Sequence, residues 1–478
     1  MLSSIYQTPL ALLTDLYQLT MSYGYFKANQ HQKQAVFHLF FRKNPFKGSF
    51  TVAAGLDYAI DYIQNLQFAP SDLAYLETLR GNNNQPLFDA DFLHFLSDYR
   101  FKGNIMGVAE GTVVFPHQPL LRIEADLLSC QLLETPLLNL LNFQSLIATK
   151  AARVAFAAQS NSVLEFGLRR AQGVDGALAA SRAAFIGGCD ATSNVLAGKL
   201  FGIPVRGTHA HSWVMSFDTE LEAFEQYAAA MPNNCVFLVD TYNTLEGVQK
   251  AIKVGLQLKE RGFEMIGIRL DSGDLASLSI AARAALDAAG LTNALIVASN
   301  DLDEYEIARL KANGAPIAIW GVGTRLVTAY DQPALGGVYK LGAIQNAKTG
   351  NWDYKIKLSE DPIKTSNPGK IGVVRAFDAM GQPLGDLLYN ELMGKAQLQG
   401  ISYQNEPINL TTTTHHTQQL LQSIFNNGHC CYARPALTEI KQYAKQQIEL
   451  FANVPTPYPT GLDAQLYALK QALIKEKQ

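Results

Sequence analysis

Eight short apolar runs, separated by helical segments, alternate along the middle of the chain and restrict its fold more than any other feature. The runs are 163–166 (VLEF), 184–186 (AFI), 203–205 (IPV), 235–239 (CVFLV), 265–268 (MIGI), 294–297 (ALIV), 316–319 (PIAI) and 337–341 (GVYKL). Strands that alternate with helices are typical of parallel βαβ units. The pattern predicts an α/β fold built on an irregular (β/α) barrel, with a doubly wound open sheet as the alternative.

The segments on either side of these runs predict two further parts. Residues 1–130 combine a helix over 12–26, an alternating strand over 34–41 and several short β runs, which indicates an N-terminal α+β domain. Residues 131–345 would form the barrel. Residues 346–478 would form a C-terminal extension, with a hairpin around Gly381, that packs on the N-terminal domain and the barrel.

Polar or glycine residues follow most of the predicted strands. In parallel units the carboxyl ends of the strands meet at one rim, so these side chains are expected to lie near one another. The group comprises Glu165, Arg169, Arg170, Thr208, His209, His211, Asp240, Arg269, Asp271, Asp274 and Thr324. Arginine pairs with phosphate or carboxylate, carboxylates hold magnesium, and the glycines of GVGT at 321–324 offer backbone N–H groups to a phosphate. Each carboxylate alone is more often structural, but their common position favours a site for an anionic polyphosphate substrate.

Two histidines, His209 and His211, stand one residue apart in the segment 204–217, PVRGTHAHSWVMSF. A histidine in such a loop can act as a general acid or base, or as a nucleophile. A pair with this spacing is about as often a satisfied polar pair, so spacing alone leaves both interpretations open.

Composition excludes several other classes of protein. The net charge of −3 gives no basic footprint for nucleic acid, and no apolar run is long enough to span a membrane. The chain has five cysteines and, at its start, no basic segment before an apolar stretch, so we expect a cytoplasmic protein without a signal peptide. No GxxxxGK[ST] motif is present, so any use of ATP would follow a route other than a P-loop.

A series of motifs carries a resemblance to a known family. The motifs are TDLYQLTM at 14–21, EFGLRRAQG at 165–173, GTHAHSWVMSF at 207–217, DTYNTLEGV at 240–248, IRLDSGDL at 268–275, GVGT at 321–324 and GGVYKL at 336–341. In this order they resemble nicotinate phosphoribosyltransferase. The resemblance runs from about residue 10 to 370 and is less distinctive over the last hundred residues.

The resemblance implies an activity and a set of site residues. Members of the family join nicotinate to 5-phosphoribosyl 1-diphosphate, giving nicotinate mononucleotide and diphosphate, and couple this to ATP hydrolysis through a phosphohistidine, with Mg²⁺ as cofactor. The resemblance makes His211 the phosphohistidine and gives no role to His209. It assigns nicotinate binding to Tyr17, Thr208 and Arg269, phosphoribosyl diphosphate binding to Arg169, Gly323 and Thr324, and catalysis to His211, Arg269 and Asp271, with Asp271 also near the magnesium.

The resemblance further implies a homodimer with its active sites at the subunit interface and with Tyr17 donated by the partner subunit. Three alternatives are weighed against this reading. They are a nicotinamide phosphoribosyltransferase of the same fold, an unrelated barrel enzyme such as an aldolase or isomerase, and a catalytically inactive relative. An unrelated barrel enzyme would not account for the whole series of motifs. The presence of His211, Arg269 and Asp271 argues against a catalytically inactive relative.

Overall fold

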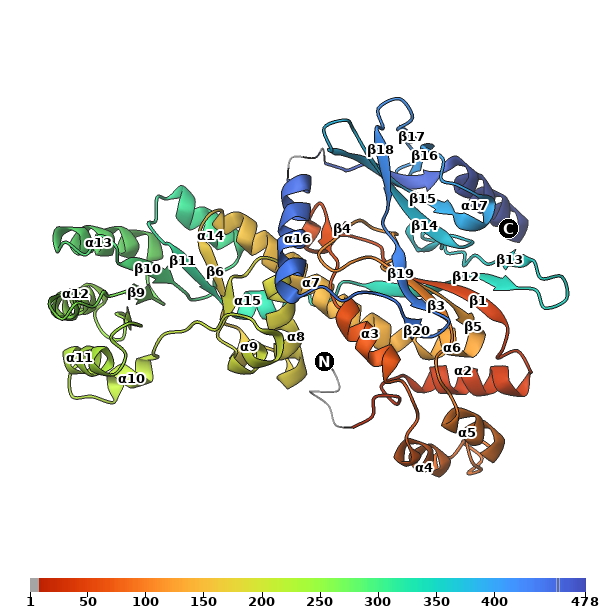
Figure 1. The fold of residues 1–478 in the computed structure, drawn as a ribbon, viewed down its shortest axis with the longest axis horizontal. Helices are drawn as coiled ribbons and strands as arrows, with labels where there is room; N and C mark the ends of the chain where they lie inside the picture. The colour runs from red at the N-terminus through yellow and green to blue at the C-terminus, as the bar shows by residue number, and fades with distance from the viewer. Residues whose placement is uncertain (1–7, 453, 455) are drawn as a thin grey trace. The chain divides into compact units, whose positions relative to one another are not determined.

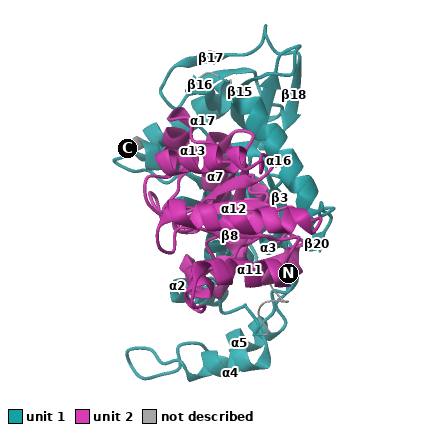
Figure 2. Ribbon diagram, turned by 90° about the vertical axis from the view of Figure 1, so that its left-hand side faces the viewer, with its two compact units in different colours: residues 1–146, 334–478 teal, residues 147–333 magenta. Residues whose placement is uncertain are grey.

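The protein, seen here as a computed structural model, is described over residues 8–452, 454 and 456–478 (Figure 1). It divides into two compact units, where the sequence analysis divided the chain into three parts. Unit 1 contains residues 1–146 and 334–478, and unit 2 contains residues 147–333 (Figure 2). The division falls within helix α7 (Glu134–Ala158). The two ends of the chain therefore belong to the same unit.

Unit 1 contains a seven-stranded antiparallel sheet. Its order is β13 (Trp352–Tyr354), β12 (Gly337–Gln345), β1 (Gln34–Phe41), β5 (Leu121–Asp126), β3 (Asn104–Gly107), β19 (Gln422–Asn426) and β20 (His429–Cys430). Every β1 residue after Gln34 is buried, as expected for a strand with a neighbour on each side. The prediction that 337–341 forms the last barrel strand is wrong, because β12 pairs antiparallel with β1. The stacked rings of Phe37 and Tyr339, 5.0 Å apart, show that the apolar side chains of β12 pack within unit 1 instead.

Unit 1 also contains a six-stranded sheet. Its order is β17 (Pro407–Asn409), β16 (Gln399–Ser402), β21 (Thr460–Asp463), β15 (Pro383–Asn390), β14 (Ile371–Phe377) and β18 (His416–Gln419), and β2 (Thr51–Val52) pairs separately with β4 (Val113–Val114). The predicted hairpin is confirmed, since β14 and β15 pair antiparallel and Gly381 between them has a φ of 78°. The helices of unit 1 are α2 (Leu16–Lys27), α3 (Leu56–Gln64), α4 (Pro70–Thr78), α5 (Ala90–Ser97), α6 (Leu127–Leu132), α16 (Leu437–Phe451) and α17 (Ala464–Lys477).

Unit 2 is built on a six-stranded parallel sheet. Its order is β7 (Ala191–Thr192), β6 (Ser162–Glu165), β11 (Ile319–Val322), β10 (Leu295–Ala298), β9 (Gly267–Leu270) and β8 (Val236–Leu238). The connecting helices are α8 (Gly173–Ile186), α9 (Val195–Phe201), α10 (His211–Met215), α11 (Glu220–Ala230), α12 (Thr244–Glu260), α13 (Leu275–Ala288), α14 (Glu304–Ala312) and α15 (Thr324–Val327) (Figure 1). Because the crossover helices cover the parallel sheet, its strands are buried, and the strands therefore appear in the sequence as short apolar runs.

Four of the predicted strands are confirmed, because the runs at 163–166, 235–239, 265–268 and 294–297 overlap β6, β8, β9 and β10. The run at 316–319 lies just before β11 and shares only Ile319 with it. The run at 184–186 is not a strand but the buried end of helix α8. The run at 203–205 contributes a single parallel bridge, between Val205 and Thr192. A closed barrel is not confirmed, since no strand pairing in the described part of unit 2 joins β7 to β8.

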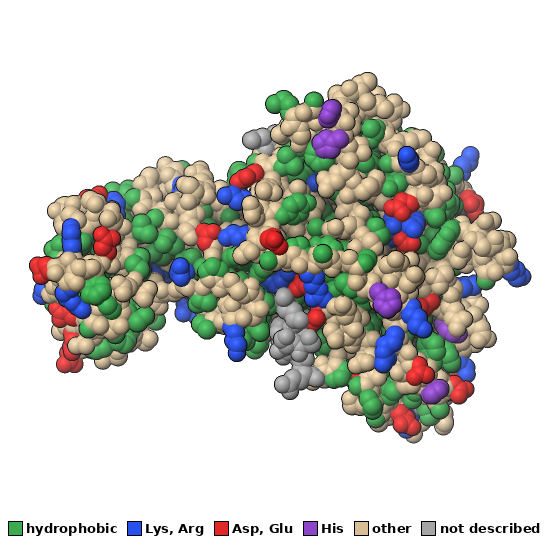
Figure 3. All heavy atoms as spheres, in the orientation of Figure 1, with side chains coloured by type: hydrophobic (Ala, Val, Ile, Leu, Met, Phe, Trp, Pro, Cys, Tyr) green, Lys and Arg blue, Asp and Glu red, His purple; other side chains and the backbone are tan. Residues whose placement is uncertain are grey.

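The mixture of charges on the surface agrees with the small net charge of the sequence. Figure 3 shows acidic and basic side chains interspersed on the face that it displays. Within the described ranges, no helix combines the length and the apolar character that crossing a bilayer would require.

Candidate active site

A cluster of hydrogen-bonded polar side chains lies at the carboxyl ends of the parallel strands of unit 2. Its centre is the Arg269 guanidinium, near the end of β9. This group donates from Nη1 to Thr208 Oγ1 at 2.9 Å, from Nη2 to Asp271 Oδ1 at 2.9 Å and from Nε to Ser299 Oγ at 2.8 Å. Ser299 directly follows β10, the strand beside β9, and Thr208 comes from the loop after the 203–205 run. Parallel strands thus bring together residues that are up to about ninety positions apart in the sequence.

Asp271 is fixed in this cluster from several directions. Its carboxylate accepts hydrogen bonds from Arg269 and from the Ser299 hydroxyl, and its backbone N–H donates to Asp240 Oδ2 at 2.8 Å. Burial by itself raises the pKa of Asp271, but the hydrogen bond from Ser299 and the charge of Arg269 outweigh burial and lower this pKa below its ordinary value. Asp271 is therefore a firmly ionised carboxylate at neutral pH.

His211 is the first residue of the short helix α10, and its ring faces the same cluster. Its Nδ1 lies 3.1 Å from Thr241 Oγ1, and its Nε2 lies 3.6 Å from Asp271 Oδ2. The side chain is 40% exposed. A partly exposed histidine that is hydrogen-bonded at one ring nitrogen, with the other close to a carboxylate but not hydrogen-bonded to it, can serve as a nucleophile or a proton carrier.

His209, the other histidine of the pair, has a structural role. Its side chain is buried, and its Nε2 accepts a hydrogen bond from the backbone N–H of Leu238 in β8 at 3.2 Å. The ring also packs edge-on to Tyr227, with 4.9 Å between ring centres. Burial lowers the pKa of His209 to about 4, so the ring is neutral and its lone pair remains an acceptor. His209 thus anchors the 207–211 loop to β8 while His211 stays accessible.

Phe166, Thr241 and Ser299 are site residues that the sequence analysis did not assign a role. The Phe166 ring centre lies 5.7 Å from the Arg269 guanidinium carbon, and the ring lies so close to Gly321 that a Cβ there would be 2.8 Å from Phe166 Cδ2. The signals were their positions, because Phe166 is the last residue of a predicted strand and Thr241 and Ser299 each lie two residues after the end of one. Nothing in those positions showed which way the side chains point.

The predicted phosphate-binding residues lie in two neighbouring loops. Arg169 is exposed in the turn that follows β6, and Gly323 and Thr324 follow β11, the strand that pairs with β6. A Cβ on Gly323 would lie 3.1 Å from the Phe166 carbonyl oxygen, so the two loops approach each other closely. The structure therefore places these three residues at the same edge of the sheet as Arg269.

Tyr17 belongs to unit 1, so the cluster in unit 2 does not contain it. It lies on α2, which begins after the N-cap residue Asp15, and its side chain is 46% exposed. Burial, followed by the charge of Glu134, raises the pKa of Tyr17. Its place at the nicotinate ring stays a prediction.

Two other carboxylates of the predicted group have structural partners. Glu165 is buried and accepts hydrogen bonds from Ser181 Oγ at 2.8 Å and Thr192 Oγ1 at 2.5 Å. Asp274 caps α13 by accepting a hydrogen bond from the Ala276 N–H. These contacts favour the structural interpretation for both residues.

The carboxylates of Asp240 and Asp271 fit a magnesium ion that is shared with a phosphate-bearing substrate. The Oδ1 atom of Asp240 is buried and has no hydrogen-bond partner among the described residues, although the Oδ2 atom of the same carboxylate accepts from Ser272 Oγ at 2.7 Å and from Asp271. The described residues contain no cluster of three or more metal-binding side chains. Magnesium is commonly bound through one or two carboxylates together with substrate phosphates, so this donor set suits it.

Comparisons with known proteins point to one family. Residues 12–142 match the family model for the nicotinate phosphoribosyltransferase N-terminal domain, and residues 372–470 match that for its C-terminal domain. Nicotinate phosphoribosyltransferase of Bacillus subtilis is 44% identical in an alignment that covers 98% of this chain and 96% of the relative. A solved structure of human nicotinic acid phosphoribosyltransferase is 32% identical, with a TM-score of 0.81 over 96% of this chain and 99% of that one.

A more distant solved structure has the same fold. It is a nicotinate-nucleotide pyrophosphorylase from Pyrococcus furiosus, with a TM-score of 0.71 at 20% identity over 93% of this chain and 96% of that one. At this identity the likeness concerns the fold alone.

Proposed function

The chain belongs to the nicotinate phosphoribosyltransferase family, and we propose that its strand-end cluster joins nicotinate to 5-phosphoribosyl 1-diphosphate. The products are nicotinate mononucleotide and diphosphate, which places the reaction in NAD biosynthesis by salvage of nicotinate. The observation that carries the proposal is the Arg269 guanidinium, held by Thr208, Ser299 and Asp271 at the carboxyl ends of parallel strands.

Arg269 supplies the group that recognises nicotinate. Its guanidinium has five N–H donors, of which one on each nitrogen is used within the cluster, so one on Nη1 and one on Nη2 remain. Two parallel N–H groups match the two oxygens of a carboxylate. With the carboxylate there, the flat pyridine ring would lie against Phe166, and Tyr17 would cover the ring from a second side.

The transfer step needs placement rather than a strong base. The pyridine nitrogen attacks the anomeric carbon, and the bond from that carbon to the diphosphate oxygen breaks with its electron pair leaving on diphosphate. Positive charge builds on the ribose and negative charge on the leaving group. Arg169, Gly323 and Thr324 would hold the phosphates of the donor, so that the pyridine and the anomeric carbon are held in line.

Asp271, with the unpartnered oxygen of Asp240 beside it, would hold a magnesium ion together with the diphosphate. Bound there, magnesium would offset the negative charge of the leaving group. The lowered pKa of Asp271 keeps its carboxylate ionised for this task.

His211 would link the reaction to ATP. If Nδ1–H donates to Thr241, the lone pair of Nε2 is free to attack the terminal phosphorus of ATP. An N–P bond then forms, the P–O bond to ADP breaks, and the phosphohistidine later loses its phosphoryl group to water. His209, which is buried against Leu238, takes no part in this step.

Two further properties complete the proposal. We place the enzyme in the cytoplasm, which the five free cysteines support, and we infer a homodimer in which the partner subunit donates Tyr17 to the site.

The nicotinamide enzyme of the same fold is the alternative function, and Arg269 argues against it. A carboxamide presents a nitrogen donor where Arg269 offers only donors, so nicotinamide would lose one of the two hydrogen bonds. The test gives the purified protein equal amounts of both pyridines with 5-phosphoribosyl 1-diphosphate, magnesium and ATP, and measures the two mononucleotides by chromatography. Nicotinate mononucleotide should predominate, and an excess of nicotinamide mononucleotide would overturn the assignment.

A further inference from the structure

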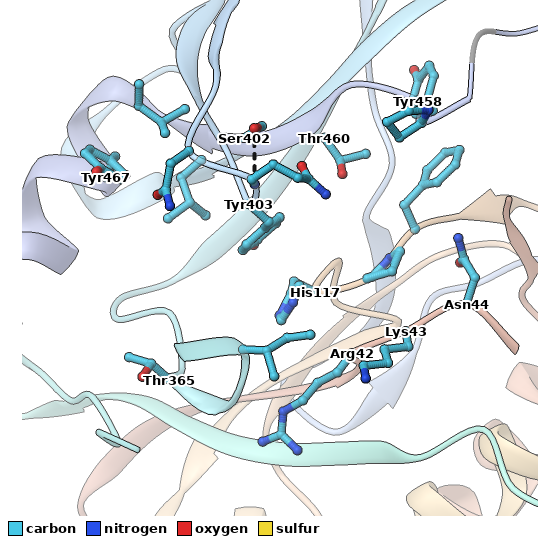
Figure 4. A pocket seen from close by; sticks show the side chains of 18 of the residues that line it. Arg42, Lys43, Asn44, His117, Thr365, Ser402, Tyr403, Tyr458, Thr460 and Tyr467 are labelled. Atoms are coloured by element: carbon cyan, nitrogen blue, oxygen red, sulfur yellow. Dashed lines mark hydrogen bonds between the residues drawn. The ribbon is translucent and has the colours of Figure 1, made fainter. Parts of the chain in front are cut away.

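A pocket of about 720 Å³ in unit 1 has a strongly cationic lining that the transfer reaction does not use. The lining contains four cationic residues, Arg42, Lys43, Lys47 and Lys470, and one carboxylate, Asp361. Figure 4 shows that Arg42 extends away from Tyr403. Asp361 forms an ion pair at 3.5 Å with Lys364, which is not part of the lining, so the charge of Asp361 does not neutralise the cationic residues of the pocket.

Lys470 on α17 is the distinctive group of this pocket. Its side chain is only 9% exposed, and its Nζ donates to Asn367 Oδ1 at 2.9 Å and to the Thr365 carbonyl oxygen at 3.4 Å. No carboxylate of the described residues forms an ion pair with it. A buried ammonium group without a counter-ion is costly, and burial lowers the pKa of Lys470 to about 8. One N–H of Lys470 remains to bind an anion.

The residues around Lys470 are linked to one another by a hydrogen bond and by ring stacking. Asn367, which accepts from Lys470, donates from Nδ2 to the Tyr403 hydroxyl at 3.1 Å. The Tyr403 ring stacks on His117, with 4.2 Å between ring centres (Figure 4). His117 has a φ of 69°, a left-handed conformation that is unusual for a residue other than glycine. Such conformations cluster at binding sites, where the surrounding structure holds them in place.

The rim adds further anion-binding groups. Lys43 and Lys47 are exposed in the loop that follows β1, and Lys47 also has a left-handed backbone, with a φ of 51°. Hydroxyl and amide groups of Asn44, Ser402 and Thr460 line the same space. Lysines together with neutral hydrogen-bonding groups are typical of sites that bind phosphate.

We propose that this pocket binds an organic phosphate of about the size of a mononucleotide, with its phosphate held by Lys470 and the rim lysines. The volume sets the size of the ligand, because an inorganic phosphate ion would leave most of about 720 Å³ empty, whereas small-molecule sites occupy roughly 300–1,000 Å³. All of the lining residues belong to unit 1, whereas the Arg269 cluster belongs to unit 2.

The test is equilibrium dialysis of the full-length protein with radiolabelled adenosine 5′-monophosphate as the probe. Lys470→Met keeps the length of the side chain and removes its charge, and should weaken binding at least tenfold. The double variant Lys43→Gln, Lys47→Gln changes only exposed side chains and should also weaken binding, so the proposal does not depend on the folding of one variant. Arg269→Ala should leave the binding at this pocket unchanged.

Four results would overturn the proposal. The first is that the probe does not bind, and the second is that Arg269→Ala abolishes its binding while Lys470→Met leaves it intact. The third is that adenosine competes as strongly as the monophosphate, and the fourth is that inorganic phosphate competes as strongly as the nucleotide. The second result would place the probe in the strand-end cluster, and the last would mean a simple ion site.

Discussion

Nε2 of His211 lies 3.6 Å from Oδ2 of Asp271. The two residues come from loops that follow different strands and are 60 positions apart in the chain. Asp271 is also tied to Arg269, so the histidine that we expect to carry a phosphoryl group and the arginine that we expect to bind nicotinate share one carboxylate. The proposed ATP step and the proposed transfer step therefore take place in the same site.

The hydrogen bond between Thr241 and His211 predicts the effect of Thr241→Val on phosphorylation. Without the hydroxyl, Nδ1 loses the partner that sets the tautomer of the ring, so phosphorylation should slow by a factor of roughly 5 to 10, from the usual value of one neutral hydrogen bond. The measurement is the incorporation of acid-labile label from γ-labelled ATP. In the wild-type protein the label should map to His211, and label on His209 instead would refute this role.

Arg269→Lys should impair nicotinate turnover although it preserves the charge. Lysine cannot donate simultaneously to Thr208, Ser299, Asp271 and a carboxylate, so we expect a loss of about 2–3 kcal/mol in transition-state binding, or roughly 30- to 150-fold in kcat/KM. Arg261→Lys, at an exposed position after α12, is the matched control and should behave as wild type. Normal steady-state kinetics of Arg269→Lys would remove this residue from the site.

His209 should make unit 2 less stable in mild acid. Its pKa is lowered to about 4 in the folded protein from about 6.5 in the unfolded chain, so protons bind preferentially to the unfolded chain between these values. Stability is full above about pH 6.5 and falls as the pH drops toward 4, by about 2 kcal/mol between pH 7 and pH 5 for this group.

The variant His209→Gln tests this assignment. Glutamine can accept the Leu238 N–H but does not titrate, so the variant should lose less free energy of unfolding than wild type between pH 7 and pH 5 in chemical denaturation. His38 and His117, whose pKa values burial lowers to about 3, contribute equally to both proteins and cancel in the comparison. Equal losses in the two proteins would contradict the assigned role.

The strands of unit 2 were predictable for a physical reason, and so were the errors. β8, β9 and β10 are largely buried and are followed by polar residues, so each appears in the sequence as a nearly continuous apolar run that ends abruptly. The buried end of α8 looks the same over three residues, because periodicity cannot separate a short helical stretch from a strand. The run that became β12 has the right composition for a strand, but composition does not identify the partner, which is β1.

The sequence also predicted which residues form the candidate site, but not the contacts of their side chains. Thr208, His211, Arg269 and Asp271 could be grouped because each lies at or after the end of a predicted parallel strand. The contacts of Phe166 with Arg269 could not be predicted, because they depend on the direction of a side chain and on the absence of a Cβ at Gly321.

Tyr17 should act in the site of the partner subunit. A stacked aromatic ring contributes about 0.5–1.5 kcal/mol beyond its burial, so Tyr17→Ala should weaken nicotinate binding more than donor binding. When Tyr17→Ala subunits are mixed with His211→Ala subunits, the ATP-stimulated turnover at low nicotinate should rise above that of either variant alone by up to about a quarter of the wild-type value, because half of the dimers are mixed and one of their two sites is intact. The absence of recovery, with subunit exchange demonstrated, would mean that Tyr17 does not act across an interface.

The most direct test of the central claim is the formation of nicotinate mononucleotide from labelled nicotinate, 5-phosphoribosyl 1-diphosphate and magnesium, measured with and without ATP. We predict that the wild-type protein forms the mononucleotide and forms more of it with ATP. We predict that His211→Ala keeps its fold, because His211 is a partly exposed residue at the start of a short helix, and that it loses the stimulation by ATP. If the wild-type protein forms no mononucleotide, or if ATP stimulates His211→Ala as strongly as wild type, the account is contradicted.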